Sequence, residues 1–374
     1  MGIYLDNAAT TAIDPQVFEA MLPYLKEEYG NPSSIHGFGR NTKAAIEKAR
    51  KSVANHFQAS VGEIFFTSGG TESANLIIQS LAQSDRIAHI ISTKIEHHCV
   101  LHSVEEMAAK NYISAHYLKL DKKGNIDFSE LEDLLKKYGD KSLIALMHAN
   151  NEIGTLLNLQ AVAELSREYG TLFFSDTVQS VAHYNIDLQK TPVDFITGSA
   201  HKFHGPKGVG FVYINSDVKV QPLIFGGSQE RNMRAGTENI YGIVGMAKAL
   251  DMAYETLETN AKYISGLKQY FFEALQKAIP GVEVNGAFGT DSLYTVLNVS
   301  FPKNEKTEFL LYNLDIEGIA VSAGSACTSG SDQGSHVLNG IGVSPERSSI
   351  RFSFSKMNNK AELNQVLELV KKAF

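Results

Sequence analysis

The 374-residue sequence contains two cysteines, Cys99 and Cys327. So few cysteines exclude a small disulfide-stapled scaffold and favour a reducing compartment. No run approaches the ~18 consecutive apolar residues that a membrane span needs, and the first residues show neither a basic region nor an apolar signal core. The formal net charge of -7 gives no general attraction to nucleic acid or anionic membranes. These absences predict a cytoplasmic protein with neither a membrane nor a nucleic acid among its partners.

The remaining composition is that of an ordinary globular protein. Hydrophobic residues make up 43% of the chain and charged residues 20%, enough to bury a large core. A chain of this length exceeds the size at which a single core stops growing, so two domains are expected. The sequence shows no internal repeat and no low-complexity segment.

Short apolar runs alternate with helical patterns between about Val61 and Ile214. Runs without alternation, separated by helices, indicate a parallel sheet covered on both faces. The predicted strands are residues 63–67, 87–92, 143–147, 171–175 and 193–197, with 209–214 as a further strand, and amphipathic helices are expected at 128–138 and 159–169.

The character of the chain changes after Gly236. Helical patterns, two strand-like runs and a loop rich in glycine and serine predict a smaller α+β unit. Helices are expected at 239–257, 262–278 and 306–314, strands at 295–301 and 349–353, the loop at 322–335, and a terminal helix up to Phe374.

The segment from Ser199 to Gly208 follows a predicted buried strand and contains Lys202. A lysine just past the carboxyl end of such a strand lies where open α/β sheets bind ligands. The nearby hydroxyl and imidazole side chains suit a phosphate. A pyridoxal-phosphate enzyme needs such an amine beside a phosphate site. The alternative is a surface lysine in a turn.

Two further strand ends carry polar groups that suit the same cofactor. Ser68–Ser73 opens a helix, whose first backbone N–H groups and Thr71 hydroxyl form an anion site. Asp176 could hold a pyridine nitrogen protonated, and Gln179 could reach the same ring. The alternatives are ordinary helix caps in both places.

Asn151 and His97 follow two other predicted strands. An asparagine suits a ring hydroxyl, although the segment also reads as a turn. An imidazole can stack on a cofactor or move protons. His97, His98 and Cys99 also raise a zinc hypothesis, but no second Cys/His pair has ligand spacing, so no metal is expected.

Cys327 and Arg351 complete the set of candidates. Cys327 lies between glycines and small residues, which predicts a mobile loop with a reactive thiol. Arg351 lies within a short strand pattern, where its guanidinium fits a substrate carboxylate. A salt bridge between elements is the alternative for Arg351.

Together these segments resemble the cysteine desulfurases of the nitrogen-fixation and iron–sulfur-cluster type, which depend on pyridoxal phosphate. The similarity covers nearly the whole chain. It rests on the shared order of Tyr4–Thr11, Gly30–His36, Thr67–Ser73, Glu96–His98, Asn150–Gly154, Asp176 with Gln179, Ser199–Gly208, Arg234–Thr237, Gly324–Ser329 and Ile350–Ser353. Gly70 departs from the family, in which alanine is frequent before the threonine.

The resemblance implies an aspartate-aminotransferase-like fold (fold type I). A large domain with a mainly parallel sheet would span residues 15–257. A smaller α+β domain would comprise 1–14 and 258–374 and carry the cysteine loop.

The resemblance also implies roles for single residues. Lys202 corresponds to the Schiff-base lysine, Cys327 to the nucleophile, and His97 to the stacking and proton-shuttling residue. The remaining implied contacts are Asp176 with the pyridine nitrogen, Gln179 and Asn151 near the ring hydroxyl, Gly70, Thr71, Ser199 and His201 at the phosphate, Thr237 reaching the phosphate from the other subunit of a homodimer, and Asn31 and Arg351 at the substrate carboxylate.

The expected activity is conversion of L-cysteine to L-alanine with sulfur retained on Cys327 as a persulfide. The sulfur would pass on to an acceptor protein, such as an iron–sulfur scaffold or a tRNA-thiolation protein. Three alternatives stay open: a selenocysteine lyase or cystine C–S lyase on the same scaffold, a non-catalytic sulfur-carrier subunit, and a hydrolase that pairs Cys327 with a histidine.

Overall fold

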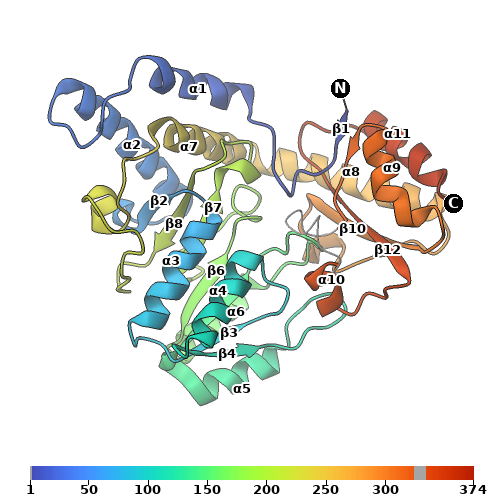
Figure 1. Cartoon of the computed structure of the whole chain (residues 1–374), viewed down its shortest axis with the longest axis horizontal. Helices are drawn as coiled ribbons and strands as arrows, with labels where there is room; N and C mark the ends of the chain where they lie inside the picture. The colour runs from blue at the N-terminus through green and yellow to red at the C-terminus, as the bar shows by residue number, and fades with distance from the viewer. Residues whose placement is uncertain (1, 324–333) are drawn as a thin grey trace.

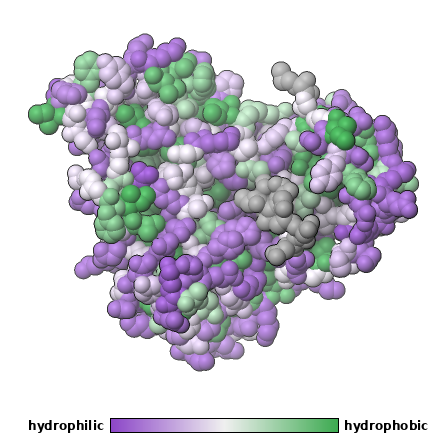
Figure 2. All heavy atoms as spheres, viewed as in Figure 1, coloured by the Kyte–Doolittle hydropathy of each residue, from purple (hydrophilic) through white to green (hydrophobic). Residues whose placement is uncertain are grey.

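The computed structural model describes residues 2–323 and 334–374. The chain forms two lobes, a larger one built around a seven-stranded sheet and a smaller one that carries both ends of the chain (Figure 1). Polar side chains cover most of the face in Figure 2, and apolar side chains gather there only in separate clusters. No helix among the described residues is long and apolar enough to cross a membrane.

The sheet of the large lobe is mainly parallel, as predicted. Its strand order is β2-β8-β7-β6-β5-β3-β4. β8 runs antiparallel to both of its neighbours, and the other neighbouring pairs are parallel. The bounds are β2 Ile64–Thr67, β3 His89–Ser92, β4 Ser114–Tyr117, β5 Ser142–Met147, β6 Leu172–Asp176, β7 Phe195–Ser199 and β8 Gly210–Ile214.

Helices cover both faces of this sheet, which explains the unbroken apolar runs. Phe173 packs with the helices α1, α2, α5, α6 and α7, whereas its neighbour Phe174 packs with α3 and α4 on the opposite face. Both rings are fully buried. The helices are α1 Pro15–Lys26, α2 Gly37–His56, α3 Gly70–Gln83, α4 His98–Ala109, α5 Phe128–Tyr138, α6 Leu159–Glu168 and α7 Ile240–Glu255.

The small lobe is an α+β unit with its own core. β10 pairs antiparallel with β12 and β9, and β1 pairs parallel with β11. Leu5 belongs to the same core as the C-terminal helix. The elements are β1 Ile3–Tyr4, β9 Glu283–Val284, β10 Val296–Pro302, β11 Ile319–Ala320, β12 Arg347–Ser353, α8 Leu257–Ala278, α9 Leu310–Ile316, α10 His336–Gly340 and α11 Lys360–Lys371.

Short 3₁₀ helices complete the fold: η1 Val61–Glu63, η2 Gly139–Lys141, η3 Ala200–Lys202, η4 Gln229–Asn232, η5 Gly289–Asp291 and η6 Thr307–Phe309. The sequence analysis assigned no strand to β4, and the structure shows why. β4 is one of the two edge strands, and its side chains are exposed or only partly buried, so it lacks the apolar run of the other strands.

Lys268 of α8 is buried against neutral partners. Its amine donates to the Ser292 hydroxyl at 2.7 Å and to the Leu293 carbonyl at 2.9 Å. Burial lowers the pKa of Lys268 from 10.5 to about 7. The native state therefore disfavours the charged amine that the unfolded chain carries up to about pH 10.5.

We expect this lysine to make stability depend on pH. Between pH 7 and about 10.5 the unfolded state binds more protons at Lys268, so native stability rises with pH. The free energy of unfolding of the wild type should rise relative to that of Lys268→Met by up to ~1.4 kcal/mol per pH unit. Urea unfolding at pH 7, 8 and 9 measures the difference. Lys277→Met, an exposed position on the same helix, is the control, and parallel profiles for wild type and Lys268→Met would refute the assignment.

Candidate active site

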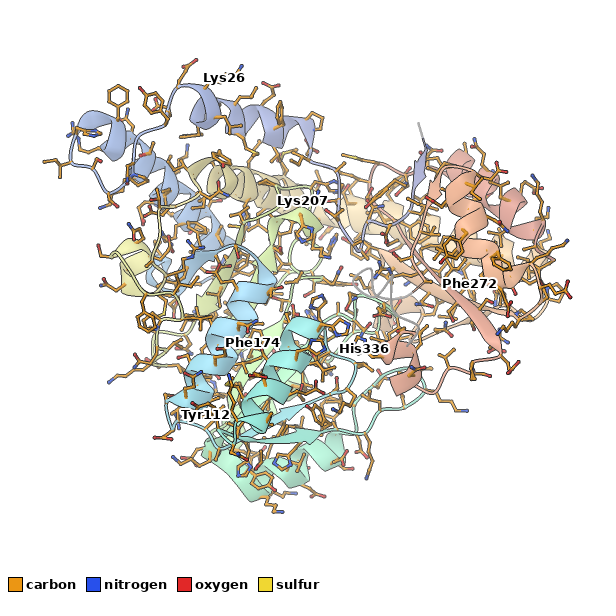
Figure 3. The ribbon with its side chains drawn as sticks, in the orientation of Figure 1. Lys26, Tyr112, Phe174, Lys207, Phe272 and His336 are labelled. Carbon is orange, nitrogen blue, oxygen red and sulfur yellow. The ribbon has the colours of Figure 1, made fainter. Side chains whose placement is uncertain are left out.

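A cavity of about 490 Å³ lies at the carboxyl ends of the large-lobe strands and reaches Arg351 of β12. Figure 3 labels Lys207, one of its lining residues, near the middle of the molecule between the lobes. Ten of the predicted site residues line this one cavity: Gly70, Thr71, His97, Asn151, Asp176, Gln179, Ser199, His201, Lys202 and Arg351. Parallel strands direct their carboxyl ends to the same sheet edge, which is why residues distant in sequence meet here.

Lys202 enters the cavity from the turn after β7. The strand ends at Ser199 and continues directly into η3, which ends at Lys202. The Lys202 amine donates to the carbonyl oxygens of Ala8 at 2.6 Å and Ala9 at 2.9 Å. Two hydrogen bonds therefore hold the lysine amine against the N-terminal segment, so Lys202 is not a surface lysine in an exposed turn.

Asp176 ends the neighbouring strand β6 and is buried. One carboxylate oxygen accepts from the Val178 N–H at 3.0 Å, and the other lies 4.0 Å from the Cys99 sulfur. Burial raises the pKa of Asp176, and the Lys202 charge opposes this shift. The helix-cap alternative fails, because the residues after Asp176 form turns. Asp176 therefore receives one backbone N–H and a distant thiol and has room for a further donor. A buried carboxylate of this kind suits a cationic ring N–H.

The opposite end of the cavity is suited to an anion. α3 begins at Gly70, and no side chain caps its N-terminus, so backbone N–H groups remain for a ligand. A methyl group at Gly69 would lie 3.2 Å from the Ser199 hydroxyl. His201 lies on the same cavity wall, its Nδ1 3.1 Å from the Thr10 hydroxyl.

The structure gives a packing reason for glycine at position 70. A Cβ there would lie 2.6 Å from Cγ2 of Val178, which also lines the cavity. Val178 thus occupies the space that an alanine side chain would need. An alanine at position 70 would therefore require Val178 to shift.

His97 is the N-cap of α4 and is held in the neutral form. Its Nδ1 accepts from the Cys99 N–H at 3.2 Å. Burial and the Lys202 charge lower the pKa of His97 to about 4. Burial, Asp176 and Glu96 raise the pKa of Cys99, so this thiol stays protonated as a packing group. Among the described residues no group of three or more potential ligands is arranged to hold a metal ion.

Arg351 is both a cavity residue and a member of a salt bridge. Its guanidinium is 1% exposed; it donates to the Asn151 carbonyl at 2.9 Å and pairs with Asp6 at 2.8 Å. Asp6 also accepts from the Ser322 hydroxyl at 2.9 Å. The alternative proposed from sequence is therefore present in the structure, beside the cavity wall.

Two of the predicted residues that the structure describes, Asn31 and Thr237, do not line this cavity. Asn31 is exposed, and its side chain accepts from the Ser33 N–H at 2.9 Å. Thr237 is exposed and lies in a separate depression with Arg234 and Glu238. Cys327 lies outside the described residues.

The sequence analysis missed the contribution of the N-terminal segment. The Ala8 carbonyl also accepts from the Gln179 amide at 3.0 Å. Ala8, Ala9 and Thr10 also line the cavity, and Ala8 and Ala9 contact Lys202 through their backbone carbonyls. Residues that act through the backbone have no side-chain signal, and only their place in a family motif pointed to them.

The cavity fits pyridoxal phosphate. An amine and a buried carboxylate stand on adjacent strand ends, and an uncapped helix N-terminus with hydroxyl and imidazole groups would hold the phosphate. These are the groups that bind the aldehyde, the ring nitrogen and the phosphate of this cofactor.

Sequence comparisons identify proteins that are similar to this chain over nearly its whole length. The family model for class-V aminotransferases matches residues 3–366. The cysteine desulfurase IscS of Dictyoglomus turgidum is 44% identical over 99% of this chain and 94% of its own length. IscS of Methanosarcina thermophila is 42% identical over 99% of this chain and 91% of its own length.

Solved structures give the same result. A NifS-like protein superposes with a TM-score of 0.91 at 37% identity, covering 100% of this chain and 99% of the other. SspA in complex with cysteine superposes with a TM-score of 0.82 at 30% identity, covering 94% and 99%. The chain therefore belongs to the pyridoxal-phosphate-dependent class-V aminotransferase family and, within it, to the cysteine desulfurases.

Proposed function

We propose that this protein transfers the sulfur of L-cysteine to Cys327 and releases L-alanine, using Lys202 and Asp176 at the cofactor. The observation that carries the proposal is the meeting of Lys202, Asp176 and Arg351 at one cavity. Relatives named cysteine desulfurase and a neighbour solved in complex with cysteine support L-cysteine as the substrate.

The bound cofactor supplies an electron sink for the charge that develops on the substrate carbon. Lys202 would hold the cofactor through its Nζ, and the same amine would move the α proton of the substrate. Asp176 keeps the ring nitrogen protonated, which the sink requires. The N-terminus of α3, Thr71, Ser199 and His201 bind the phosphate, and Asn151 and Gln179 orient the ring.

The sulfur step needs a thiolate, a proton and a held carboxylate. Cys327, as thiolate, attacks the substrate sulfur. An S–S bond forms, the substrate C–S bond breaks, and the Cβ atom gains a proton to give alanine. His97 is neutral in this site, and uptake of the thiol proton by its imidazole requires its pKa to rise from about 4 once cofactor and substrate are bound. Arg351 binds the substrate carboxylate, for which it must exchange part of its pairing with Asp6.

We also propose a homodimer in which Asn31 and Thr237 serve the partner's cavity. Gln229 joins their two loops, since its side chain contacts the Ser33 hydroxyl at 3.5 Å and accepts from the Gly236 N–H at 3.1 Å. The same region exposes large apolar side chains: Tyr29, Ile35 at 91% and Phe225 at 82% exposure. An interface is expected to show exposed apolar side chains of this kind. Here they surround Asn31 and Thr237, the two predicted site residues that lie away from the cavity of this chain.

Three further points complete the proposal. A cytoplasmic location is supported by the scarcity of cysteine. The acceptor is a sulfur-carrying or cluster-assembly protein, in keeping with the names of the relatives.

The domain division at residues 14/15 and 257/258 is supported by the separate cores, since Leu5 packs with the C-terminal elements.

The first test is the covalent link to Lys202. The purified protein should carry a visible absorption band, and borohydride should fix the cofactor to the peptide containing Lys202, because reduction makes an amine link permanent. Lys202→Ala should lose this fixation, whereas the cavity variant Lys207→Ala should retain it on Lys202. Fixation on Lys207, or a wild type that stays colourless after cofactor is added, would contradict the assignment.

The second test concerns the sulfur carrier. Brief exposure to L-cysteine should add one sulfur, about 32 Da, to the Cys327 peptide. Cys327→Ser should bind cofactor and substrate but release almost no alanine, whereas Cys99→Ser should still show the added mass on Cys327. Normal alanine release by Cys327→Ser would favour a lyase, and turnover of selenocysteine alone would favour a selenocysteine lyase.

The third test concerns the shared site. Wild type mixed with Lys202→Ala forms heterodimers in which the intact lysine site receives an intact Thr237. Wild type mixed with the Lys202→Ala/Thr237→Ala double variant gives the same site without Thr237, so activity should be lower. Equal activities would rule out the crossing, and a monomer in sedimentation at micromolar concentration would rule out the dimer.

A further inference from the structure

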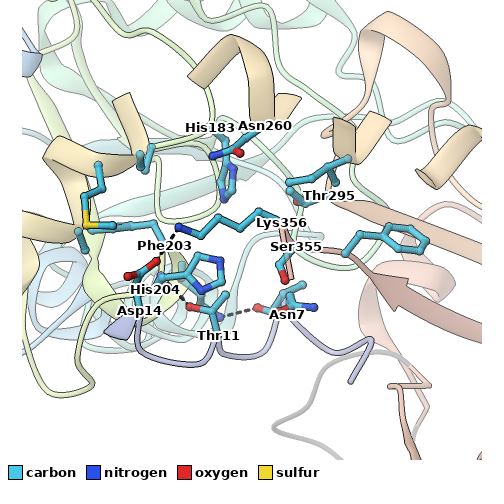
Figure 4. A pocket seen from close by; sticks show the side chains of 18 of the residues that line it. Asn7, Thr11, Asp14, His183, Phe203, His204, Asn260, Thr295, Ser355 and Lys356 are labelled. Carbon is cyan, nitrogen blue, oxygen red and sulfur yellow. Dashed lines mark hydrogen bonds and ion pairs between the residues drawn. The ribbon is translucent and has the colours of Figure 1, made fainter. Parts of the chain in front are cut away.

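The N-terminal strap, defined as residues 5–14, crosses between the two lobes. Leu5 packs in the small-lobe core, and Asp14 caps α1 of the large lobe. Between them the strap passes directly beside the lysine segment. Figure 4 shows Thr11 and Asp14 of the strap beside His204.

Thr11 joins the strap to the lysine segment by hydrogen bonds. Its hydroxyl donates to the His201 carbonyl at 2.9 Å and accepts from the His204 N–H at 2.8 Å. Its own N–H donates to the same His201 carbonyl at 2.8 Å. Thr11 is 4% exposed, so water does not compete for these contacts. One side chain thus holds the backbone on both sides of Lys202.

The backbone that Thr11 holds is strained. His204 has a φ of +65°, a conformation that residues other than glycine rarely adopt. Such a residue persists only where its surroundings determine it. The His204 carbonyl is held too, because it accepts from the Asp14 N–H at 3.0 Å. The strap therefore fixes both polar backbone groups of the strained residue.

We propose that Thr11 is a positioning residue for Lys202. Its hydroxyl maintains the left-handed turn at His204 and so fixes the place from which the lysine side chain starts. This inference rests on the proposed function only for its effect on turnover, since the turn itself is a property of the chain. A reacting amine must be held to within a fraction of an ångström, and a displacement of about 1 Å can cost 10²-fold in rate.

The test compares two variants of Thr11 in the cofactor-loaded protein. Thr11→Val keeps the shape but removes the hydroxyl, and Thr11→Ser keeps the hydroxyl. In Thr11→Val we expect hydrogen exchange of the His204 amide to accelerate at least tenfold, and kcat to fall about 10- to 100-fold with KM for L-cysteine little changed. Thr11→Ser should restore both to near wild-type values.

Thr307 offers a matched control. It is 3% exposed, and its hydroxyl donates to the Asn304 carbonyl at 3.0 Å and accepts from the Asn304 N–H at 2.8 Å, far from the cavity. Thr307→Val removes the same pair of contacts and should leave kcat and His204 exchange unchanged.

Unchanged His204 exchange in Thr11→Val would overturn the proposal, as would equal losses of kcat in Thr11→Val and Thr307→Val. If Thr11→Val does not fold, Thr11→Ser and Thr11→Ala compared by the same exchange measurement keep the question decidable, and equal exchange in these two variants would also overturn it. The wild type could lack desulfurase activity while the exchange of its His204 amide still depended on the Thr11 hydroxyl. That result would refute the proposed function but not the role of Thr11 in holding the turn at His204.

Discussion

The amine of Lys202 donates to two backbone carbonyls, those of Ala8 and Ala9, and much of the site is arranged around this contact. The same stretch of chain accepts from Gln179, contacts His201 through Thr10 and pairs with Arg351 through Asp6. One short segment thus touches groups assigned to the cofactor ring, the phosphate and the substrate carboxylate. Residues 7–9 of this segment form a turn, and backbone carbonyls suit the task because they accept hydrogen bonds and do not titrate.

The parallel sheet accounts for the rest of the geometry. Neighbouring parallel strands end at one edge, so Asp176 and Lys202 meet without any special feature of the intervening chain. Coverage of both faces keeps water from Asp176, which raises its pKa and leaves it dependent on a positive partner. Stability of the sheet and reactivity of its edge therefore have the same cause, which is burial.

The sequence predicted the features that have a recognisable pattern of side chains, such as a charged residue after an apolar run. Asp176 and Lys202 were proposed as site residues because each is a charged residue shortly after an apolar run, and the structure places both at one cavity. The helix N-terminus at Gly70 was expected because glycines and a threonine precede an amphipathic pattern. β4 was missed because its side chains are exposed or only partly buried and so form no apolar run, unlike those of the other edge strand, β2. The strap was recognised only through resemblance, since its backbone acts and its side chains are small. Asn31 and Thr237 do not line the cavity of this chain, so their assignment to the site stays a prediction that depends on the proposed dimer.

The strap also constrains the order in which the chain can assemble. Asn7 donates to the Ser353 carbonyl, a partner 346 positions later in the chain, and Ala8 donates to the Ser353 hydroxyl. During synthesis from the N-terminus, these first-made residues have no strand to pair with until β12 has left the ribosome. The large-lobe sheet, complete at Ile214, can form earlier, because domains fold as units during translation. The contacts that join the strap to the small lobe can therefore form only after nearly the whole chain has been synthesised.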